Sequence, residues 1–143
     1  MNYKFYGHDT PNLKSINKDY LKIESQRHLY ELLCDCWCVE TCAPRLREKW
    51  SENNKTAGQC SITAFLVQDI FGADVYGVTL NNGDIHCFNR IRNIEFDLTS
   101  EQFKNEVLDY SKGEKQTREI HFQKKEKYDR YLLLKKKLLE KLK

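Results

Sequence analysis

Apolar side chains recur every three or four residues in three stretches of the chain, which is the spacing of one helix face. The first stretch covers residues 23–38, and Pro44 after it favours the first turn of a shorter helix. The second covers residues 60–71 and is followed by Gly72, a residue typical of helix ends. The third covers residues 124–143, where lysines alternate with the leucines and tyrosines of an amphipathic pattern. We therefore predict a helix in each stretch.

Between residues 73 and 99 the apolar period becomes two, as in β-strands. The runs ADVYGVTL and DIHCFNRI flank an Asn-Gly turn, and NIEFDLT follows with a third alternating pattern. These runs predict three antiparallel strands. Thr99 and Gln102 have the spacing of a capping box, so we expect a helix over residues 100–111. The run TREIHF, residues 117–122, favours one further short strand.

Together these elements predict an α+β fold. N-terminal helices and the helix that begins at Cys60 pack on a small antiparallel sheet, and a C-terminal amphipathic helix closes the chain. A length of 143 residues suits a single domain. Residues 1–20 are polar and irregular, and Pro11 argues against an early helix there, so we expect them to form an arm or a cover.

Composition and charge exclude several classes of protein. No apolar stretch approaches the ~20 residues that span a bilayer, and the first ten residues lack the pattern of a signal peptide. We therefore expect a cytoplasmic protein with no membrane partner. The net charge of +3 is concentrated in residues 112–143, which hold 12 Lys/Arg against 5 Asp/Glu. No aromatic or glycine-rich recognition motif accompanies these lysines, so we expect a solvated helix face and no nucleic-acid partner.

Cys60 stands where the second helix begins, directly after Gly58 and Gln59. The first turn of a helix exposes unpaired N–H groups and about half a positive charge, so a thiol there ionises more readily than a free one. Gly58 permits a tight turn and a close approach by a ligand, and the N–H groups of the first turn can receive an oxyanion. Gln59 is a candidate oxyanion donor through its side-chain amide. A buried structural cysteine is the competing interpretation of Cys60.

A nucleophilic thiolate needs a base, and the base needs an orienting partner. His86 lies on the strand after the Asn-Gly turn, and Asp97 lies on the next strand, out of phase with the apolar Ile94 and Phe96. If these strands pair, the carboxylate and the imidazole meet on one sheet face. Each residue alone also has a structural interpretation, but the combination predicts a triad of Cys60, His86 and Asp97 as nucleophile, base and orienter.

Two further residues are candidates for substrate binding. Asn89 is an alternative orienter, although on a regular strand it faces away from His86. Trp50 is either a core residue or a platform for substrate.

Four cysteines near the first helix form a C-x-C-x-C-x3-C pattern, which suggests a metal site: Cys34, Cys36, Cys38 and Cys42. Zinc sites usually use pairs at C-x2-C spacing so that four ligands converge. In a helix, Cys36 would point away from the other three. We therefore expect no metal and no cofactor. A zinc-stabilised structural protein and a regulatory disulfide with Cys60 remain the alternatives.

Four segments, in their order and spacing, resemble the sequence blocks of the YunG-like family of small bacterial proteins. The segments are CWCVETCAPRLREKWSENN, GQCSITAFLVQDIFG, HCFNRI and FDLTSEQF. The resemblance covers residues 28–143 as one domain and leaves residues 1–27 as an N-terminal arm or extension. It implies a papain-like or transglutaminase-like α+β fold, and the family carries an aromatic residue at the position of Cys87. The matching positions are Trp37, Trp50, Gly58, Gln59, Cys60, Thr63, His86, Asn89, Asp97, Thr99, Gln102 and Phe103.

The predicted triad and this resemblance together lead us to expect a cysteine-dependent hydrolase or acyltransferase. A peptidase, an amidase, a deamidase and a transamidase all fit this chemistry, with a peptide, a protein or a small amide as substrate. The alternative is a non-catalytic module that binds a peptide or a small molecule in the same groove.

Overall fold

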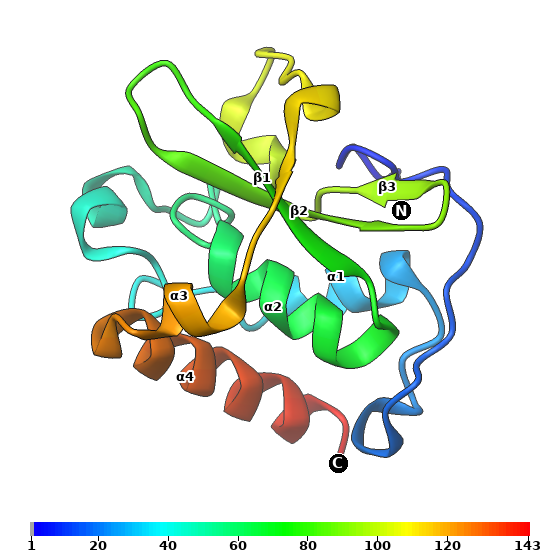
Figure 1. The fold of residues 1–143 in the computed structure, drawn as a ribbon. Helices are drawn as coiled ribbons and strands as arrows, with labels where there is room; N and C mark the ends of the chain where they lie inside the picture. The colour runs from blue at the N-terminus through cyan, green and yellow to red at the C-terminus, as the bar shows by residue number, and fades with distance from the viewer. Residues whose placement is uncertain (1) are drawn as a thin grey trace.

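A computed structural model describes residues 2–143 (Figure 1). Within these residues, four antiparallel strands form one sheet in the order β3-β2-β1-β4. The strands are β1 (Asp74–Thr79), β2 (Ile85–Ile91), β3 (Ile94–Phe96) and β4 (Glu114–Lys115). The helices are α1 (Gln26–Cys34), α2 (Cys60–Phe71), α3 (Arg118–Phe122) and α4 (Lys125–Lys141). Short 3-10 helices are η1 (Lys18–Tyr20), η2 (Pro44–Lys49), η3 (Ser100–Phe103) and η4 (Tyr110–Lys112). The predicted α+β class with a small antiparallel sheet is confirmed.

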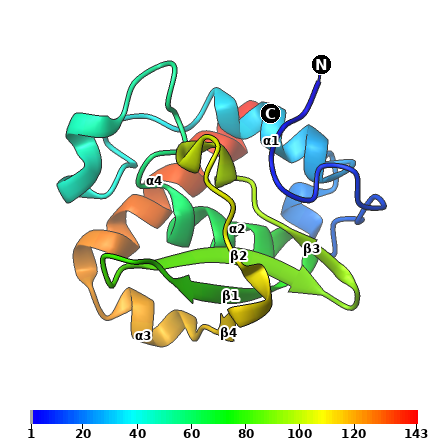
Figure 2. The same cartoon turned by 90° about the horizontal axis from the view of Figure 1, so that it is seen from above.

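Helix α2 is the centre of the molecule, lying between the sheet and α4 (Figures 1 and 2). Nine of its 12 residues are buried, because the sheet covers one side and α4 covers the other. The helix ends at Gly72, which has a φ of +76° and adopts the left-handed conformation that glycine tolerates best. The predicted helix over residues 60–71 is therefore confirmed, and its first residue lies at one end of this central layer.

The N-terminal segment, expected as an arm or extension, packs into the core. Phe5, Leu13, Tyr20 and Ile23 are almost fully buried among the residues of α1 and α2. Tyr6 forms an isolated antiparallel bridge with Asp97. The start of the described chain thus reaches a residue of the predicted site.

Two predicted elements are wrong. The helix expected over residues 100–111 is only the short η3, after which Lys104 takes a positive φ of 55°. The hydroxyl of Thr99 donates to Asp97 at 3.2 Å instead of capping a helix, so the capping box does not form.

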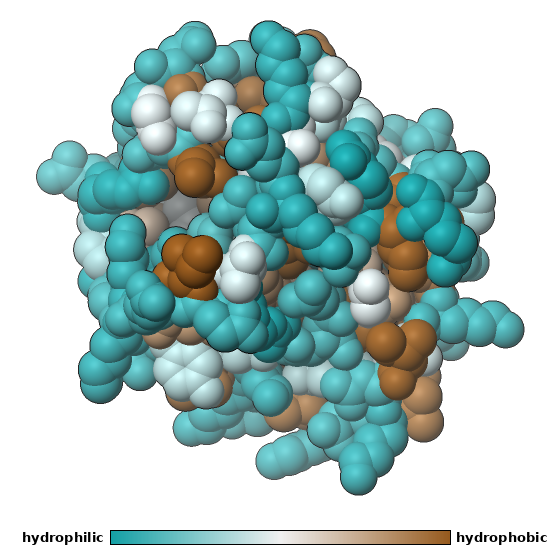
Figure 3. Space-filling view, viewed as in Figure 1, coloured by the Kyte–Doolittle hydropathy of each residue, from teal (hydrophilic) through white to brown (hydrophobic). Residues whose placement is uncertain are grey.

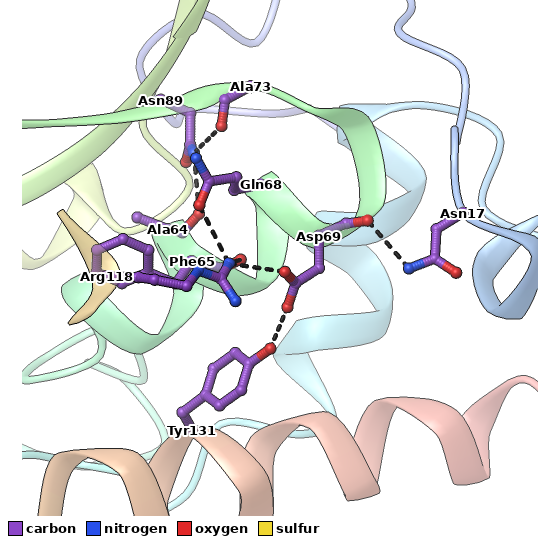
Figure 4. A network of polar contacts seen from close by, with 9 residues as sticks. All are labelled: Asn17, Ala64, Phe65, Gln68, Asp69, Ala73, Asn89, Arg118 and Tyr131. Atoms are coloured by element: carbon purple, nitrogen blue, oxygen red, sulfur yellow. Dashed lines mark hydrogen bonds and ion pairs between the residues drawn. The ribbon is translucent and has the colours of Figure 1, made fainter. Parts of the chain in front are cut away.

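The strand expected at residues 117–122 is helix α3, and the fourth strand is the two-residue β4 before it. The guanidinium of Arg118 donates to Asp69 Oδ1 at 2.7 Å and to the carbonyl of Phe65 at 3.1 Å (Figure 4). Asp69 also accepts the hydroxyl of Tyr131 from α4. These contacts attach α3 and α4 to α2, which the alternation of the sequence did not reveal.

The surface is mostly hydrophilic on the face drawn in Figure 3. The predicted C-terminal helix is confirmed as α4, which buries Tyr131, Leu134 and Leu138 and leaves Lys125 and Lys136 exposed. Among residues 2–143, none of the helices has both the length and the apolar character that crossing a bilayer requires.

Candidate active site

Cys60 is the first residue of α2 and is partly exposed. The first N–H groups of a helix have no partner inside the helix, so they point outward beside this thiol. The loop before it turns at Gly58, which has a φ of +70°. A Cβ at Gly58 would lie 2.5 Å from the sulfur of Cys42, so only glycine fits between the two segments.

His86 and Asp97 form a buried hydrogen-bonded pair, with Nε2 and Oδ2 separated by 2.6 Å. Both side chains are about 1% exposed. The β2–β3 register pairs Asn89 with Phe96. Asp97 therefore lies opposite the β2 residue two positions after His86, and the two side chains share one face of the sheet. Because Nε2 is engaged by the carboxylate, Nδ1 is the ring nitrogen left for the thiol of Cys60.

Three further donors hold the carboxylate of Asp97. The hydroxyl of Tyr110 donates to Oδ2 at 2.7 Å, and the backbone N–H and the hydroxyl of Thr99 donate to Oδ1 at 3.1 and 3.2 Å. The ring of Tyr110 stacks on that of Tyr6 with centroids 3.9 Å apart. A buried carboxylate with this many donors keeps one orientation.

The electrostatics of the site favour an ion pair. The largest effect on the pKa of Cys60 is a hydrogen bond from the thiol of Cys87, which lowers it, whereas burial raises it. The hydrogen bond and the charge of His86 lower the pKa further, so that it lies well below its usual range. Burial acts to lower the pKa of His86, but the charge and hydrogen bond of Asp97 outweigh it and raise that pKa to about 10. At neutral pH the favoured state is therefore a thiolate at Cys60 beside an imidazolium at His86.

Cys87 was not among the predicted site residues. It follows His86 on β2 and is 1% exposed. Its thiol donates to Cys60, and this contact raises the pKa of Cys87 well above the usual value. Its adjacency to His86 was the available sequence signal, but strict alternation along a strand argued that neighbours face opposite ways.

Cys60 and His86 line one cleft, with a volume of about 310 Å³. Leu46 from η2 and Phe103 from η3 contribute apolar walls to it. The ring of Phe103 meets that of His86 edge-on, at 4.6 Å between centroids and 88° between planes. Lys127 from the first turns of α4 also lines this cleft and was likewise missed by the sequence analysis.

The predicted binding residues are placed differently from one another. Gly58 lines the cleft. The amide of Gln59 is buried and donates to the carbonyl of Cys38 at 3.1 Å, so that N–H is engaged away from an oxyanion site. The indole of Trp50 donates to the carbonyl of Lys55 at 2.9 Å, and Trp50 is absent from the described lining of the cleft.

Asn89 faces α2, on the sheet face opposite His86. Its amide donates to the carbonyls of Ala64 at 2.9 Å and Ala73 at 3.4 Å (Figure 4). The structure therefore gives Asn89 a role in joining β2 to α2 and to the connection between α2 and β1, and Asp97 occupies the orienter position instead.

The four cysteines at residues 34–42 do not converge. Within residues 2–143, no group of three or more His, Cys, Asp or Glu side chains gathers as metal ligands would. All six cysteines of the chain are free thiols. Burial raises the pKa values of Cys34 and Cys42, and raises that of Cys36 to about 11. This arrangement gives the zinc alternative no support.

A family model described as YunG protein matches residues 25–143. The chain belongs to the YunG family. The resemblance drawn from the sequence blocks is thereby confirmed. A segment of 56 residues is 38% identical to a bacterial relative, "Uncharacterized protein YunG" of Bacillus subtilis (strain 168), and covers 39% of this chain. The alignment spans 48%, about half, of the length of that curated relative. No solved structure matches the chain.

The YunG match includes Cys60, His86 and Asp97 but begins after the segment that carries Tyr6. Tyr6 stacks on Tyr110, and Tyr110 donates a hydrogen bond to the carboxylate of Asp97. Part of the support of Asp97 therefore comes from outside the region that the family model matches.

Proposed function

We propose that the protein is a cysteine-dependent hydrolase or acyltransferase that acts on an amide, with Cys60 as nucleophile, His86 as acid and base, and Asp97 as orienter. One observation carries the proposal: the Asp97–His86 pair, joined at 2.6 Å, stands beside a thiol at the start of a long helix in an open cleft. A buried ion pair is costly when its only task is stability, so its position at a reactive group favours function.

The proposed chemistry starts from a thiolate at Cys60 and an imidazolium at His86. The thiolate of Cys60 attacks the amide carbonyl, forming a C–S bond, while the first-turn N–H groups of α2 stabilise the oxyanion. The imidazolium of His86 then gives its proton to the leaving nitrogen as the C–N bond breaks, which leaves a thioester and a neutral imidazole.

The neutral imidazole completes the cycle. It takes a proton from the incoming acceptor, which attacks the thioester carbonyl and releases the thiolate of Cys60 beside a regenerated imidazolium. With water as acceptor the net reaction is hydrolysis, as in a peptidase, an amidase or a deamidase. With an amine it is transamidation. Asp97 keeps the imidazole in the tautomer and orientation that both half-reactions need.

We further propose that the fold is of the papain-like or transglutaminase-like kind, and that the substrate is a peptide, a protein or a small amide. A cysteine at a helix start, a histidine on a strand and an acidic orienter on the next strand, in this chain order, support that assignment. The small volume of the cleft supports a single side chain or a compact amide at the reacting position.

The test is thiol alkylation with iodoacetamide from pH 5 to 10, with each labelled cysteine located by peptide mass spectrometry. We expect Cys60 to react first, with an apparent pKa well below the ~8.5 of a free thiol. An acid quench after incubation with a pool of peptide and side-chain amides should then trap a thioester on the wild type and none on Cys60→Ala. Six equally slow thiols and no adduct would overturn the proposal. A Cys60→Ala variant that still retains a ligand, with no turnover by the wild type, would favour a binding module.

A further inference from the structure

The Cys60 cleft contains more positive than negative charge. Besides His86, which is paired with Asp97, four cationic side chains and two carboxylates line it. Both carboxylates are already paired with arginines: Asp84 with Arg45 at 2.6 Å, and Glu126 with Arg130. Arg130 is also fixed by donating to the carbonyl of Thr41 at 3.1 Å. The two arginines are therefore neutralised by partners of the protein itself.

The remaining cations are Lys124 and Lys127, at the start of α4. Within residues 2–143, neither lysine takes part in a salt bridge. Lys124 is exposed, whereas Lys127 is partly buried. Within the described chain, neither lysine is therefore paired with a carboxylate.

A neutral hydrogen-bond chain holds Lys127 in place. Its ammonium donates to Nδ1 of His121 at 2.9 Å, so Nε2 of His121 carries the ring proton and donates to Oε1 of Gln116 at 2.9 Å. Burial and the neighbouring ammonium lower the pKa of His121 to about 4, so its imidazole is uncharged. This chain orders the ammonium without cancelling its charge.

Lys127 lines the same cleft as the reacting sulfur of Cys60. Burial lowers the pKa of Lys127, and the sulfurs of Cys87 and Cys60 act in the opposite direction because they lie nearby. The positive charge of Lys127 therefore acts, from the α4 side of the cleft, on the position where a substrate would be attacked. His86 reaches Cys60 from the sheet side, on β2.

We propose that Lys127, assisted by Lys124, makes this cleft selective for amides that carry a carboxylate close to the bond that is broken. This inference rests on the proposed function in so far as the substrate is an amide. The selectivity for a carboxylate depends only on the residues that line the cleft. An anionic group seated between the two lysines would be the carboxylate partner that neither lysine has in the fold, and it would leave the Arg45–Asp84 and Arg130–Glu126 pairs intact. Lys127 is a specificity-determining residue in this proposal, and His121 is its positioning residue.

Two alkylating reagents of similar size test the proposal without a known substrate. Iodoacetate carries a carboxylate next to its reactive carbon, and iodoacetamide is its neutral counterpart. Both rates depend equally on how much Cys60 is ionised, so their ratio isolates the attraction of the cleft for a carboxylate. We expect the iodoacetate-to-iodoacetamide ratio at Cys60 to exceed that of free cysteine. Lys127→Gln should lower the ratio by about 3- to 10-fold, as removal of one charge several ångströms away in a solvated cleft implies.

Matched variants separate this effect from loss of fold or of total charge. Lys125→Gln removes the same charge two residues before Lys127 in α4. Lys125 pairs with Asp129 at 2.7 Å and does not line the cleft, so this variant should leave the ratio unchanged. Lys127→Arg should keep most of the preference, and Lys124→Gln should lower it less than Lys127→Gln. High salt should reduce the preference of the wild type.

The outcomes distinguish the two proposals. An unchanged ratio in both Lys127→Gln and Lys124→Gln, with a normal circular dichroism spectrum, would overturn the carboxylate selectivity even if Cys60 is highly reactive. A sluggish Cys60 with an ordinary pKa would instead overturn the proposed function, and the ratio can still be measured from longer incubations. A ratio that falls equally in Lys125→Gln would show a general effect of charge and would also contradict selectivity.

Discussion

The two cysteine-bearing regions of this protein have opposite properties. The segment with Cys34, Cys36 and Cys42 is rich in thiols, and burial raises the pKa of each of these three. Cys60 stands alone in the sequence, yet the Cys87 thiol and His86 lower its pKa against the effect of burial. The reactivity of a thiol here depends on contacts with distant parts of the chain and not on the density of cysteines along it.

The cysteine-rich segment nevertheless supports the site through its backbone. The carbonyl of Cys38 accepts the amide of Gln59, and the carbonyl of Cys34 accepts the ammonium of Lys55 at 2.9 Å. The backbone N–H of Ala43 donates to the carbonyl of Gly58 at 2.9 Å. The segment is therefore a scaffold for the loop that ends at Cys60, and its side-chain sulfurs are not needed for that role.

The largest expected effect comes from removing one thiol from each region. Cys60→Ala should abolish the fast alkylation and should lower any amide turnover by at least about 10⁴-fold, as loss of a covalent nucleophile does. The matched Cys34→Ala should change neither by more than about 2-fold, because only the backbone of Cys34 serves the loop. Alkylation rates read by peptide mass spectrometry check both. Equal losses in the two variants would contradict the division between the regions.

The next effect concerns the charge that keeps Cys60 ionised. In Asp97→Asn the pKa of His86 should fall from about 10 toward its ordinary ~6.5, because burial lowers it and the carboxylate contributes more than Cys60 to raising it. The thiolate then loses its cationic partner above about pH 7, so the acid limb of the alkylation profile should move upward by at least about one pH unit. Tyr110→Phe, which removes a donor to Asp97 and leaves the charge, is the control.

The same pair should also make stability depend on pH. His86 has a pKa that is higher in the folded protein than its ordinary value, so its contribution is complete below about pH 6.5 and is lost as pH rises through about 10. The lowered pKa of Cys60 contributes in the opposite sense up to the ~8.5 of a free thiol, so the stability advantage of the wild type over Asp97→Asn should shrink between about pH 8.5 and pH 10. Urea unfolding at several pH values measures it, and a constant difference would contradict an ionised His86.

Most of the site geometry was predictable because it follows from local period and strand register. The start of α2 at Cys60, the pairing of β2 with β3, and the shared face of His86 and Asp97 all follow from alternation and turn signals. Apart from Cys87, which adjoins His86 on β2, the residues that were missed reach the site over long sequence distances. Lys127 comes from α4, and Tyr6 comes from the segment expected to be an arm.

In two local motifs a polar group is used by a competing partner. Thr99 and Gln102 fit a capping box, but the Thr99 hydroxyl is used by Asp97. Gln59 fits an oxyanion donor, but its amide N–H is used by the carbonyl of Cys38. In each case the residues suit the local motif, but another acceptor takes the hydrogen bond, 2 residues away for Thr99 and 21 residues away for Gln59.

A smaller effect tests the contact between the two cysteine regions. Gly58→Ala should destabilise the fold by roughly 2–4 kcal/mol, because it combines a positive φ with a Cβ placed 2.5 Å from the sulfur of Cys42. Gly83→Ala has a similar φ of +89° with nothing within 4 Å of the added Cβ, so it measures the backbone strain alone. The difference between the two variants in urea unfolding gives the steric part. Equal destabilisation would show that Cys42 does not restrict the loop.

The smallest expected effect tests the support of Asp97 from outside the matched YunG region. Tyr6→Ala removes the ring that stacks on Tyr110 at 3.9 Å and leaves the hydroxyl of Tyr110 free to reach Asp97. We expect a loss of about 1 kcal/mol in stability and a 2- to 5-fold slower alkylation of Cys60 at pH 6, because a less constrained carboxylate orients His86 less well. Tyr6→Phe keeps the stacking and loses only the bond to Glu95, so it should retain the rate. If both variants alkylate at the wild-type rate, the N-terminal segment serves the core alone, and the site is complete within residues 25–143.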